Sequence, residues 1–362
     1  MGDLPMNKKR LIALDGFRIY IVTMVLLFHA VIHKFWHLTG GGGIFFRNII
    51  TGAVYMDAFF ILSGFVLYYL YGDRLQNPSF QQVKDFYLKR FLKLYPSYLV
   101  FTVVVMVYDR SFDWKVLPAE ILCLQGFFRP IFSKFGNGGT WFISCIAFSY
   151  LLFPVLCRMV NAKTVGIMLF SFVLIVYITA FSAWYKVDEM SVYINPLYRM
   201  WEFIIGMCLS AIFLKREQKA LQNGSAVIPA LCAIGTCIVL FVIIAVLYKN
   251  NFVNHRDFAR HYIYYACVTV PLFSAIIFAL AALGDCHVKK SFLLQTISFL
   301  SALTFPFFLW QGLAERLVRD YACIHGLVGF IAVNLLLAGI SHLIFSRLAI
   351  AIGKKMKVNA SS

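Results

Sequence analysis

The sequence predicts an all-α, polytopic integral membrane protein with about ten transmembrane helices. Two observations support this fold class. Of the 362 residues, 61% are hydrophobic and only 14% are charged, which excludes an ordinary soluble domain. The hydrophobic residues also gather into separate stretches of membrane length, with basic residues at their ends. That arrangement is typical of helices that cross a bilayer.

Ten stretches of about 20 apolar residues are expected to span the membrane. They lie near residues 14–36, 49–71, 91–108, 140–160, 164–184, 196–214, 226–248, 262–283, 292–313 and 325–352. The first is expected to be a retained helix, because no small-residue cleavage site follows it. Leu117 to Phe128 is apolar but too short to cross, and is expected to be re-entrant or interfacial. Residues 1–362 are interpreted as one membrane domain with no appended soluble domain.

The basic residues predict the orientation of these spans. The net charge is +17, but Lys and Arg stand singly or in twos and threes at the ends of apolar stretches, which argues against nucleic-acid binding. With the N-terminus in the cytoplasm, inner segments hold nineteen Lys and Arg residues and outer segments twelve, with Arg18 and Arg199 left inside spans. This bias predicts an inner (plasma) membrane protein with both termini in the cytoplasm.

Arg18 and His29 lie inside the first predicted span. Ionisable groups are costly in hydrocarbon and usually face a wet cavity where they function. Eleven residues of α-helix turn about 20° past three full turns and rise about 16 Å, so both groups share one helix face. The spacing predicts the cation near one membrane surface and the imidazole near mid-membrane. The alternative is a snorkelling arginine with a structural histidine.

Other charged residues within the spans are expected to support this pair. Asp15 precedes Arg18 by three residues and can pair with it. Arg199 and Glu202 are one turn apart. They should pair with each other or with Asp15 and Arg18, since an unpaired charge inside the membrane would cost several kcal/mol. Arg199 and Glu202 are interpreted first as structural residues and second as catalytic ones. Asp57 either binds an acceptor hydroxyl or caps a helix.

Five sequence elements, in order along the chain and all on membrane segments, resemble those of the membrane-bound acyltransferase-3 family. That family O-acylates sugars and other hydroxyl compounds at the bacterial envelope. The elements are LDGFR followed after ten residues by His29, DAFFILSGFVL from Asp57, FYLKRFLKLYP from Phe86 with Arg90 and Lys93 at its basic places, TWFISCIAFSYLLFP from Thr140, and NPLYRMWEFIIGM from Asn195.

The chain departs from the family pattern at two places. Many relatives have a glutamate five residues after the tryptophan, where this chain has Ile146. Many also end a late aromatic helix with a histidine, where TFPFFLWQ ends in Gln311. Neither departure touches Arg18 or His29. They indicate a divergent subgroup with its own acceptor.

The resemblance implies acyl transfer from a thioester to a hydroxyl, with acetyl-coenzyme A or another acyl-CoA as donor and no permanently bound cofactor. His29 is the expected catalytic group, either as general base or as covalent acyl carrier. Arg90 and Lys93 suit the phosphates of the coenzyme, although each is also typical of a positive-inside anchor. A pantetheine arm of roughly 15 to 20 Å matches the rise between Arg18 and His29, so the acyl group would cross the bilayer without the nucleotide.

The acceptor implied by the resemblance is a hydroxyl of a cell-surface sugar or of a glycan precursor. Trp141 and the aromatic outer ends of the spans could stack on a sugar, or could form the aromatic belts usual at membrane interfaces. The sequence does not indicate which acceptor is used, or whether a longer acyl group replaces acetyl.

Two other classes of membrane protein compete with this interpretation. His29, His33 and His37 recur every four residues on one helix face, a spacing able to ligate a metal or haem. No opposing span offers a matching set, so no metal site is predicted. The intramembrane charges would also suit a secondary transporter, but the repeated halves and paired broken helices of transporters are missing from the sequence.

Overall fold

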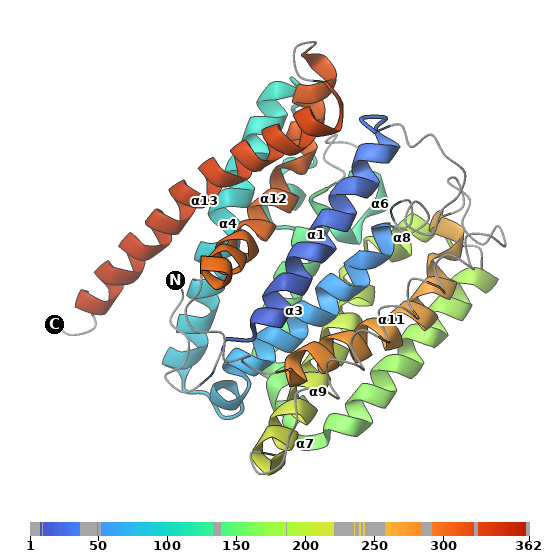
Figure 1. Cartoon of the computed structure of the whole chain (residues 1–362), viewed down its shortest axis with the longest axis vertical. Coiled ribbons are helices and arrows are strands. Elements are labelled where there is room, and N and C mark those ends of the chain that lie inside the picture. The colour runs from blue at the N-terminus through green and yellow to red at the C-terminus, as the bar shows by residue number, and fades with distance from the viewer. Residues whose placement is uncertain are drawn as a thin grey trace.

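The computed structural model describes residues 8, 10–36, 49, 52–132, 139–185, 187–220, 258–283, 292–321 and 325–359, together with 235, 239 and 242. Every regular element in these ranges is helical (Figure 1). The long helices are α1 (Ile12–Ile32), α3 (Tyr55–Tyr71), α4 (Phe80–Tyr108), α7 (Trp141–Trp184), α9 (Pro196–Ala220), α11 (Phe258–Ala282), α12 (Phe292–Asp320) and α13 (Gly326–Asn359). The short ones are η1 (Gly52–Val54), η2 (Asp73–Leu75), α5 (Leu117–Ile121), η3 (Gln125–Phe127), α6 (Arg129–Phe132) and α8 (Glu189–Tyr193).

The prediction of a multi-pass helical membrane protein is confirmed. Within the described ranges, seven segments are long and apolar enough to cross a membrane, and Tyr55–Tyr71 and Thr269–Ala282 are shorter apolar helices. α7 contributes two of the seven, because Lys163 has non-helical angles (φ −142°, ψ 53°) that divide it. The predicted span 226–248 falls on residues that are almost all outside the described ranges. The predicted number of ten is therefore approximate.

α4 begins eleven residues before the predicted start of its span. Its first turn is closed by a capping box, in which Gln82 N–H donates to Ser79 Oγ at 3.3 Å and Ser79 N–H donates to Gln82 Oε1 at 2.8 Å. This reciprocal cap satisfies two free N–H groups and allows the helix to start in a polar stretch. The hydrophobic pattern alone located only the apolar part of the helix.

α3 lies at the centre of the bundle, against α1, α9 and α11 (Figure 1). Two glycines allow its backbone to touch that of α9. A Cβ at Gly64 would collide with the carbonyl group of Phe203, and one at Gly206 with the carbonyl group of Ile61. Small residues at such crossings permit close packing of membrane helices. Gly64 therefore serves the packing of α3 against α9.

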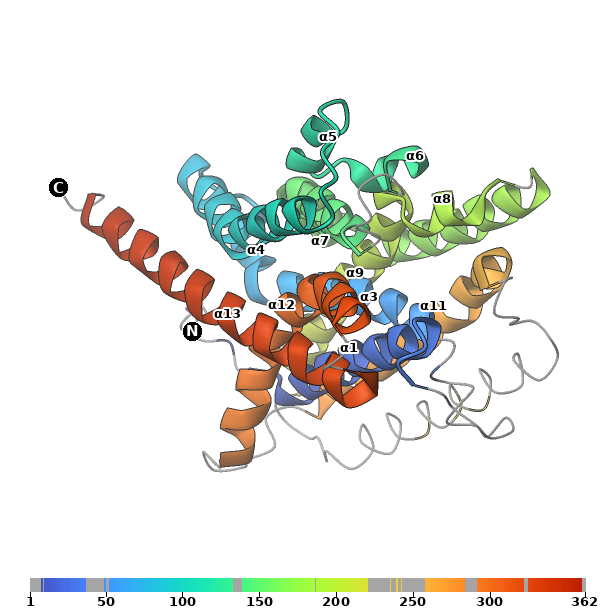
Figure 2. The ribbon, with the colours of Figure 1, turned by 90° about the horizontal axis from the view of Figure 1, so that it is seen from above.

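The segment from Leu117 to Phe128 does not cross the bundle. It forms α5 and η3, which lie beside α4 and α7 at one side of the molecule (Figure 2). Tyr98 of α4 donates from its hydroxyl to Glu120 Oε2 at 2.8 Å, and Gly126 N–H donates to Ser144 Oγ of α7 at 3.0 Å. Short helical turns held by such contacts agree with the expectation that this segment is too short to span.

Candidate active site

The N-terminal end of α1 holds a group of polar side chains around Asp15, which we call the Asp15 cluster (Arg10, Asp15, Arg18 and Ser301). Arg10 Nε lies 2.6 Å from Asp15 Oδ2. Ser301 Oγ of α12 donates to Asp15 Oδ1 at 2.7 Å, and Arg18 Nη1 lies 3.4 Å from the same oxygen. Arg18 also donates to Ser301 Oγ at 3.2 Å. The structure thus brings Asp15 and Arg18 together as their spacing predicts, while Ser301 had no signal in the sequence.

Arg90 and Lys93, one turn apart on α4, reach this cluster from a second helix. Arg90 Nη2 donates to the hydroxyl of Tyr71 at 2.8 Å, and its guanidinium lies 5.8 Å from the centre of the Tyr150 ring. Lys93 is exposed and interacts electrostatically with Arg90 and with the charged members of the Asp15 cluster. Arg10, Arg18 and Lys93 therefore interact with the Asp15 carboxylate, and Arg90 lies beside Lys93 as a fourth cation. Such an excess of positive charge favours binding of an anion.

His29 lies in the last turn of α1. Its Nδ1 is buried and accepts or donates no hydrogen bond within the described part of the chain. Because α1 is helical throughout, Arg18 and His29 share a face, as the spacing predicts. The mid-membrane position of the imidazole stays a prediction.

The structure places Gln311 beside the imidazole of His29, a contact that the sequence did not indicate. Its side chain, on α12, interacts with the imidazole. Gln311 Nε2 and the neighbouring Trp310 Nε1 are buried without a hydrogen-bond partner among the described residues. One of the two departures from the family pattern therefore lies beside His29. The other, Ile146, is a core side chain that is 3% exposed.

The histidine series on α1 does not form a metal site in the described part of the chain. His33 Nδ1 lies 3.0 Å from Glu315 Oε1, and the rings of His29 and His33 are 6.0 Å apart. His37 lies outside the described residues. No group of three His, Cys, Asp or Glu side chains suited to a metal ion occurs among the described residues. The pairing of His33 with a carboxylate is a sufficient structural explanation for it.

A second charged group, which we call the Arg199 centre (Asp57, Arg199, Glu202 and Thr269), is completely buried. Arg199 Nη1 donates to Asp57 Oδ1 at 2.8 Å and to Glu202 Oε1 at 2.7 Å, and all three side chains have no exposed surface. Thr269 Oγ1 donates to Asp57 Oδ2 at 2.6 Å. The centre joins α3, α9 and α11 through hydrogen bonds in a site without solvent. The pairing of Arg199 with Glu202 follows the prediction, but the third partner is Asp57 and not the Asp15–Arg18 pair.

Trp141 belongs to the wall of the Arg199 centre. The Arg199 guanidinium lies 5.4 Å from the centre of its ring and 4.5 Å from that of Tyr193. Trp141 is only 5% exposed, and its ring packs on the Arg199 guanidinium. Its stacking on a sugar stays a prediction. Asp57 has no exposed surface and both its oxygens are engaged. Neither acceptor binding nor helix capping is therefore favoured for it.

Two groups of functional side chains, one around Arg18 and one around His29, are separated along the helices α1 and α12. α1 and α12 run in the same direction, with Arg18 beside Ser301 near their beginnings and His29 beside Gln311 near the end of α1. A cationic cluster at one end would hold an anionic carrier, and an imidazole about 16 Å further along would meet the reacting group. Fold and site together define a multi-pass helical membrane protein in which one helix face joins a group of cations to an imidazole.

Comparison with known proteins identifies the family. A family model described as an acyltransferase domain, of the acyltransferase-3 type, matches residues 11–351. The chain belongs to this family. No solved structure matches the chain.

Two curated relatives are similar over part of their length. Acyltransferase MdmB of Streptomyces mycarofaciens is 27% identical over 168 residues, which are 44% of this chain and 42% of that protein. Peptidoglycan O-acetyltransferase OatA of Listeria monocytogenes is 28% identical over 137 residues, which are 38% of this chain and 19% of that protein. The aligned regions thus cover less than half of either relative.

Proposed function

We propose that this O-acyltransferase takes an acetyl group from acetyl-coenzyme A at the cytoplasmic face and transfers it to a hydroxyl of a cell-surface sugar or of its lipid-linked precursor. The supporting observation is the geometry of α1, which joins a cluster of four cations at one end to the partner-free Nδ1 of His29 at the other. The family assignment supplies the reaction, and this geometry supplies a path for it.

The donor binds at the cationic end. Coenzyme A bears several phosphate charges, and Arg90 and Lys93 together with Arg10 and Arg18 outweigh the single carboxylate of Asp15. Arg90 can bind a phosphate with two parallel hydrogen bonds, and its buried Nε has no partner among the described residues. The Lys and Arg bias places this end in the cytoplasm, with both termini, in the inner membrane.

The transfer step occurs at His29. A neutral imidazole nitrogen can accept the proton of an attacking hydroxyl, whose oxygen then displaces the coenzyme thiolate from the acyl carbon. The same nitrogen could instead take the acyl group and pass it on. Gln311 beside the ring can hold its orientation through a hydrogen bond, as second groups commonly do for catalytic histidines.

The acceptor follows from the chemistry of the family and of one relative. A relative acts, by its name, as a peptidoglycan O-acetyltransferase, and hydroxyls of envelope sugars are available on the face opposite the coenzyme pool. A cell-surface glycan, or the lipid-linked form in which it is built, is therefore the proposed acceptor.

The sidedness of donor binding tests this proposal. In a variant whose nine native cysteines are replaced, Lys84→Cys should react only with reagent applied on the cytoplasmic side, and Trp114→Cys only with reagent applied outside. Inverted membrane vesicles should then consume labelled acetyl-coenzyme A added to their cytoplasmic face. Labelling of Lys84→Cys from outside, or donor consumption only from the outer face, would overturn the proposed route.

A further inference from the structure

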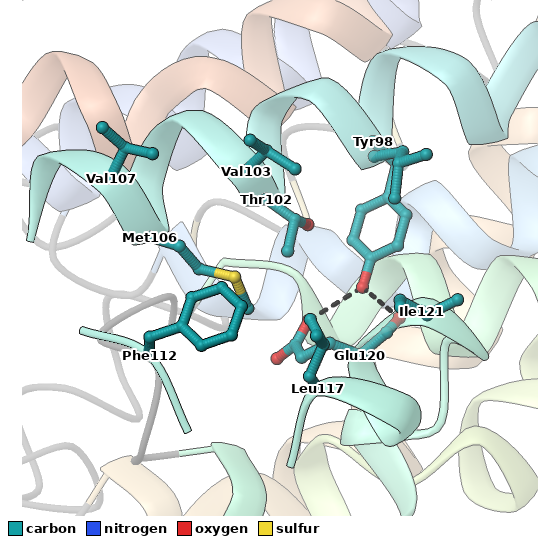
Figure 3. Close-up of a pocket in the computed structure, with 10 residues that line it drawn as sticks. Tyr98, Thr102, Val103, Met106, Val107, Phe112, Leu117, Glu120 and Ile121 are labelled. Carbon is teal, nitrogen blue, oxygen red and sulfur yellow. Dashed lines mark hydrogen bonds between the residues drawn. The ribbon is translucent and has the colours of Figure 1, made fainter. Parts of the chain in front are cut away.

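The C-terminal half of α4 has an apolar hollow on each side. The first, of about 190 Å³, lies between α4 and the segment that contains α5 (Figure 3). Its walls include Met106, Phe112, Leu117 and Ile121. The second, of about 400 Å³, lies between α4 and α12, where Leu313 and Leu317 form one wall. Neither hollow belongs to the site around Arg18 and His29.

Two valines separate the hollows and line both. Val103 and Val107 stand one turn apart on α4 and form a ridge. They are 52% and 72% exposed, on a helix long and apolar enough to cross a membrane. Apolar side chains this exposed on such a helix face the hydrocarbon of the bilayer. The occupants available to the hollows are therefore lipid chains, one on each side of the ridge.

The polar groups near the first hollow face away from it. Tyr98 donates from its hydroxyl to Glu120 Oε2 at 2.8 Å, as Figure 3 shows, and Gln125 Nε2 donates to the same hydroxyl at 3.1 Å. The first of these hydrogen bonds engages the Glu120 carboxyl group, and the second engages the Tyr98 hydroxyl. The surface left to a ligand is that of methyl, methylene and aromatic groups.

Two cations lie where the ridge ends. Arg110 and Lys115, in the loop after α4, are exposed and form no ion pair with any described residue. Arg110 has a positive φ of 49°. Ser111 N–H donates to the Met106 carbonyl at 3.1 Å, which turns the chain back so that Phe112 reaches the hollow.

The same loop holds two half-buried carboxylates. Asp109 is paired with Arg316 Nε at 2.9 Å, and Asp113 accepts from the N–H of Lys115 at 2.9 Å. The exposed charged side chains of this loop, at the end of the ridge, are therefore the two cations Arg110 and Lys115.

We propose that the C-terminal half of α4 binds an anionic phospholipid with two chains, one in each hollow, and its phosphate at Arg110 and Lys115. Two hollows on either side of one ridge match two chains, and the cations match a negative headgroup. Lipid chains gain little by leaving other lipid, so selection must come from shape and charge. The site is independent of the acyl-transfer reaction.

Native mass spectrometry of the purified protein, with equal amounts of phosphatidylglycerol and phosphatidylcholine of the same chains, tests the proposal. Phosphatidylglycerol should be retained in preference. The double variant Arg110→Ala, Lys115→Ala should reduce that preference on the order of tenfold, given about 1 kcal/mol for each cation at a lipid surface.

Tryptophan substitutions test the hollows. Val103→Trp should fill them and lower retention of phosphatidylglycerol, and Val107→Trp, at a more exposed position, serves if the first variant does not fold. Val100→Trp is the matched control, because Val100 is 43% exposed on the same helix and lines neither hollow. An equal loss in the control, equal retention of the two lipids, or equal retention of one-chain lysophosphatidylglycerol would each overturn the proposal.

Discussion

The two groups of buried and half-buried charge in this protein are built in opposite ways. In the Arg199 centre one cation meets two carboxylates, every side chain is fully buried, and aromatic rings close the remaining faces. In the Asp15 cluster one carboxylate meets two arginines, and Arg18 and the neighbouring Lys93 retain access to solvent. A closed centre stabilises the contact between three helices. An open cluster with excess positive charge remains able to bind a ligand.

The largest effect is expected at His29, at the far end of the helix that holds the open cluster. His29→Ala should fold and insert normally but lose acyl transfer by about 10²–10⁴-fold, because general-base loss has that size. The measurement is acetyl transfer by purified protein, with His33→Ala as control, since His33 is paired with Glu315. Retention of more than about a tenth of the rate would remove His29 from the mechanism.

Loss of the cation in the Arg199 centre should lower the stability of the folded protein. Arg199→Met leaves two carboxylates buried without their cation, and breaking a buried pair in this way typically costs about 3–5 kcal/mol. We expect a large fall in the thermal unfolding midpoint in detergent, together with loss of activity. A variant that unfolds like the wild type but no longer transfers acyl groups would assign Arg199 to catalysis. The Arg199 centre would then not be a purely structural group.

Glu120 adds a third case to this comparison. It is a buried carboxyl group that forms no ion pair with any described residue. Burial raises its pKa to about 7 from an ordinary value of 4.5. The folded state then holds a proton that the unfolded state has lost, so stability should fall as the pH rises from about 4.5 to 7, by on the order of 3 kcal/mol. Thermal unfolding between pH 5 and 8 measures this slope. Glu120→Gln should flatten it, and an unchanged slope in that variant would show that another group titrates.

The donor residues should give a smaller, more specific effect. The double variant Arg90→Ala, Lys93→Ala should raise the KM for acetyl-coenzyme A about tenfold or more, because each charged hydrogen bond contributes about 1.5–3 kcal/mol. Lys93→Arg should change the KM by less than about threefold, since the cation remains. Lys89→Ala, an exposed neighbour, is the control. Unchanged donor affinity in the double variant would leave these residues only a role in membrane topology.

Local pattern was enough to predict the class of fold. Nine of the ten predicted spans coincide, within the described residues, with a long helix or with one half of α7, and most of their apolar ends agree within a few residues. This agreement arises because a helix buried in hydrocarbon needs a length that is visible in the sequence. The common face of Arg18 and His29 followed from helical periodicity alone. The motifs predicted the acyltransferase-3 family, and the comparison with the family model confirmed that family.

Tertiary structure decided which charged groups meet. Asp57 and Arg199 are 142 residues apart, and Asp15 and Ser301 are 286 residues apart. The sequence did not predict either pair, because the periodicity of one helix does not specify its neighbours. Packing specifies them: Gly64 and Gly206 allow α3 and α9 to touch, and that contact brings Asp57 to Arg199. Packing likewise buried Trp141 and placed Gln311 beside His29.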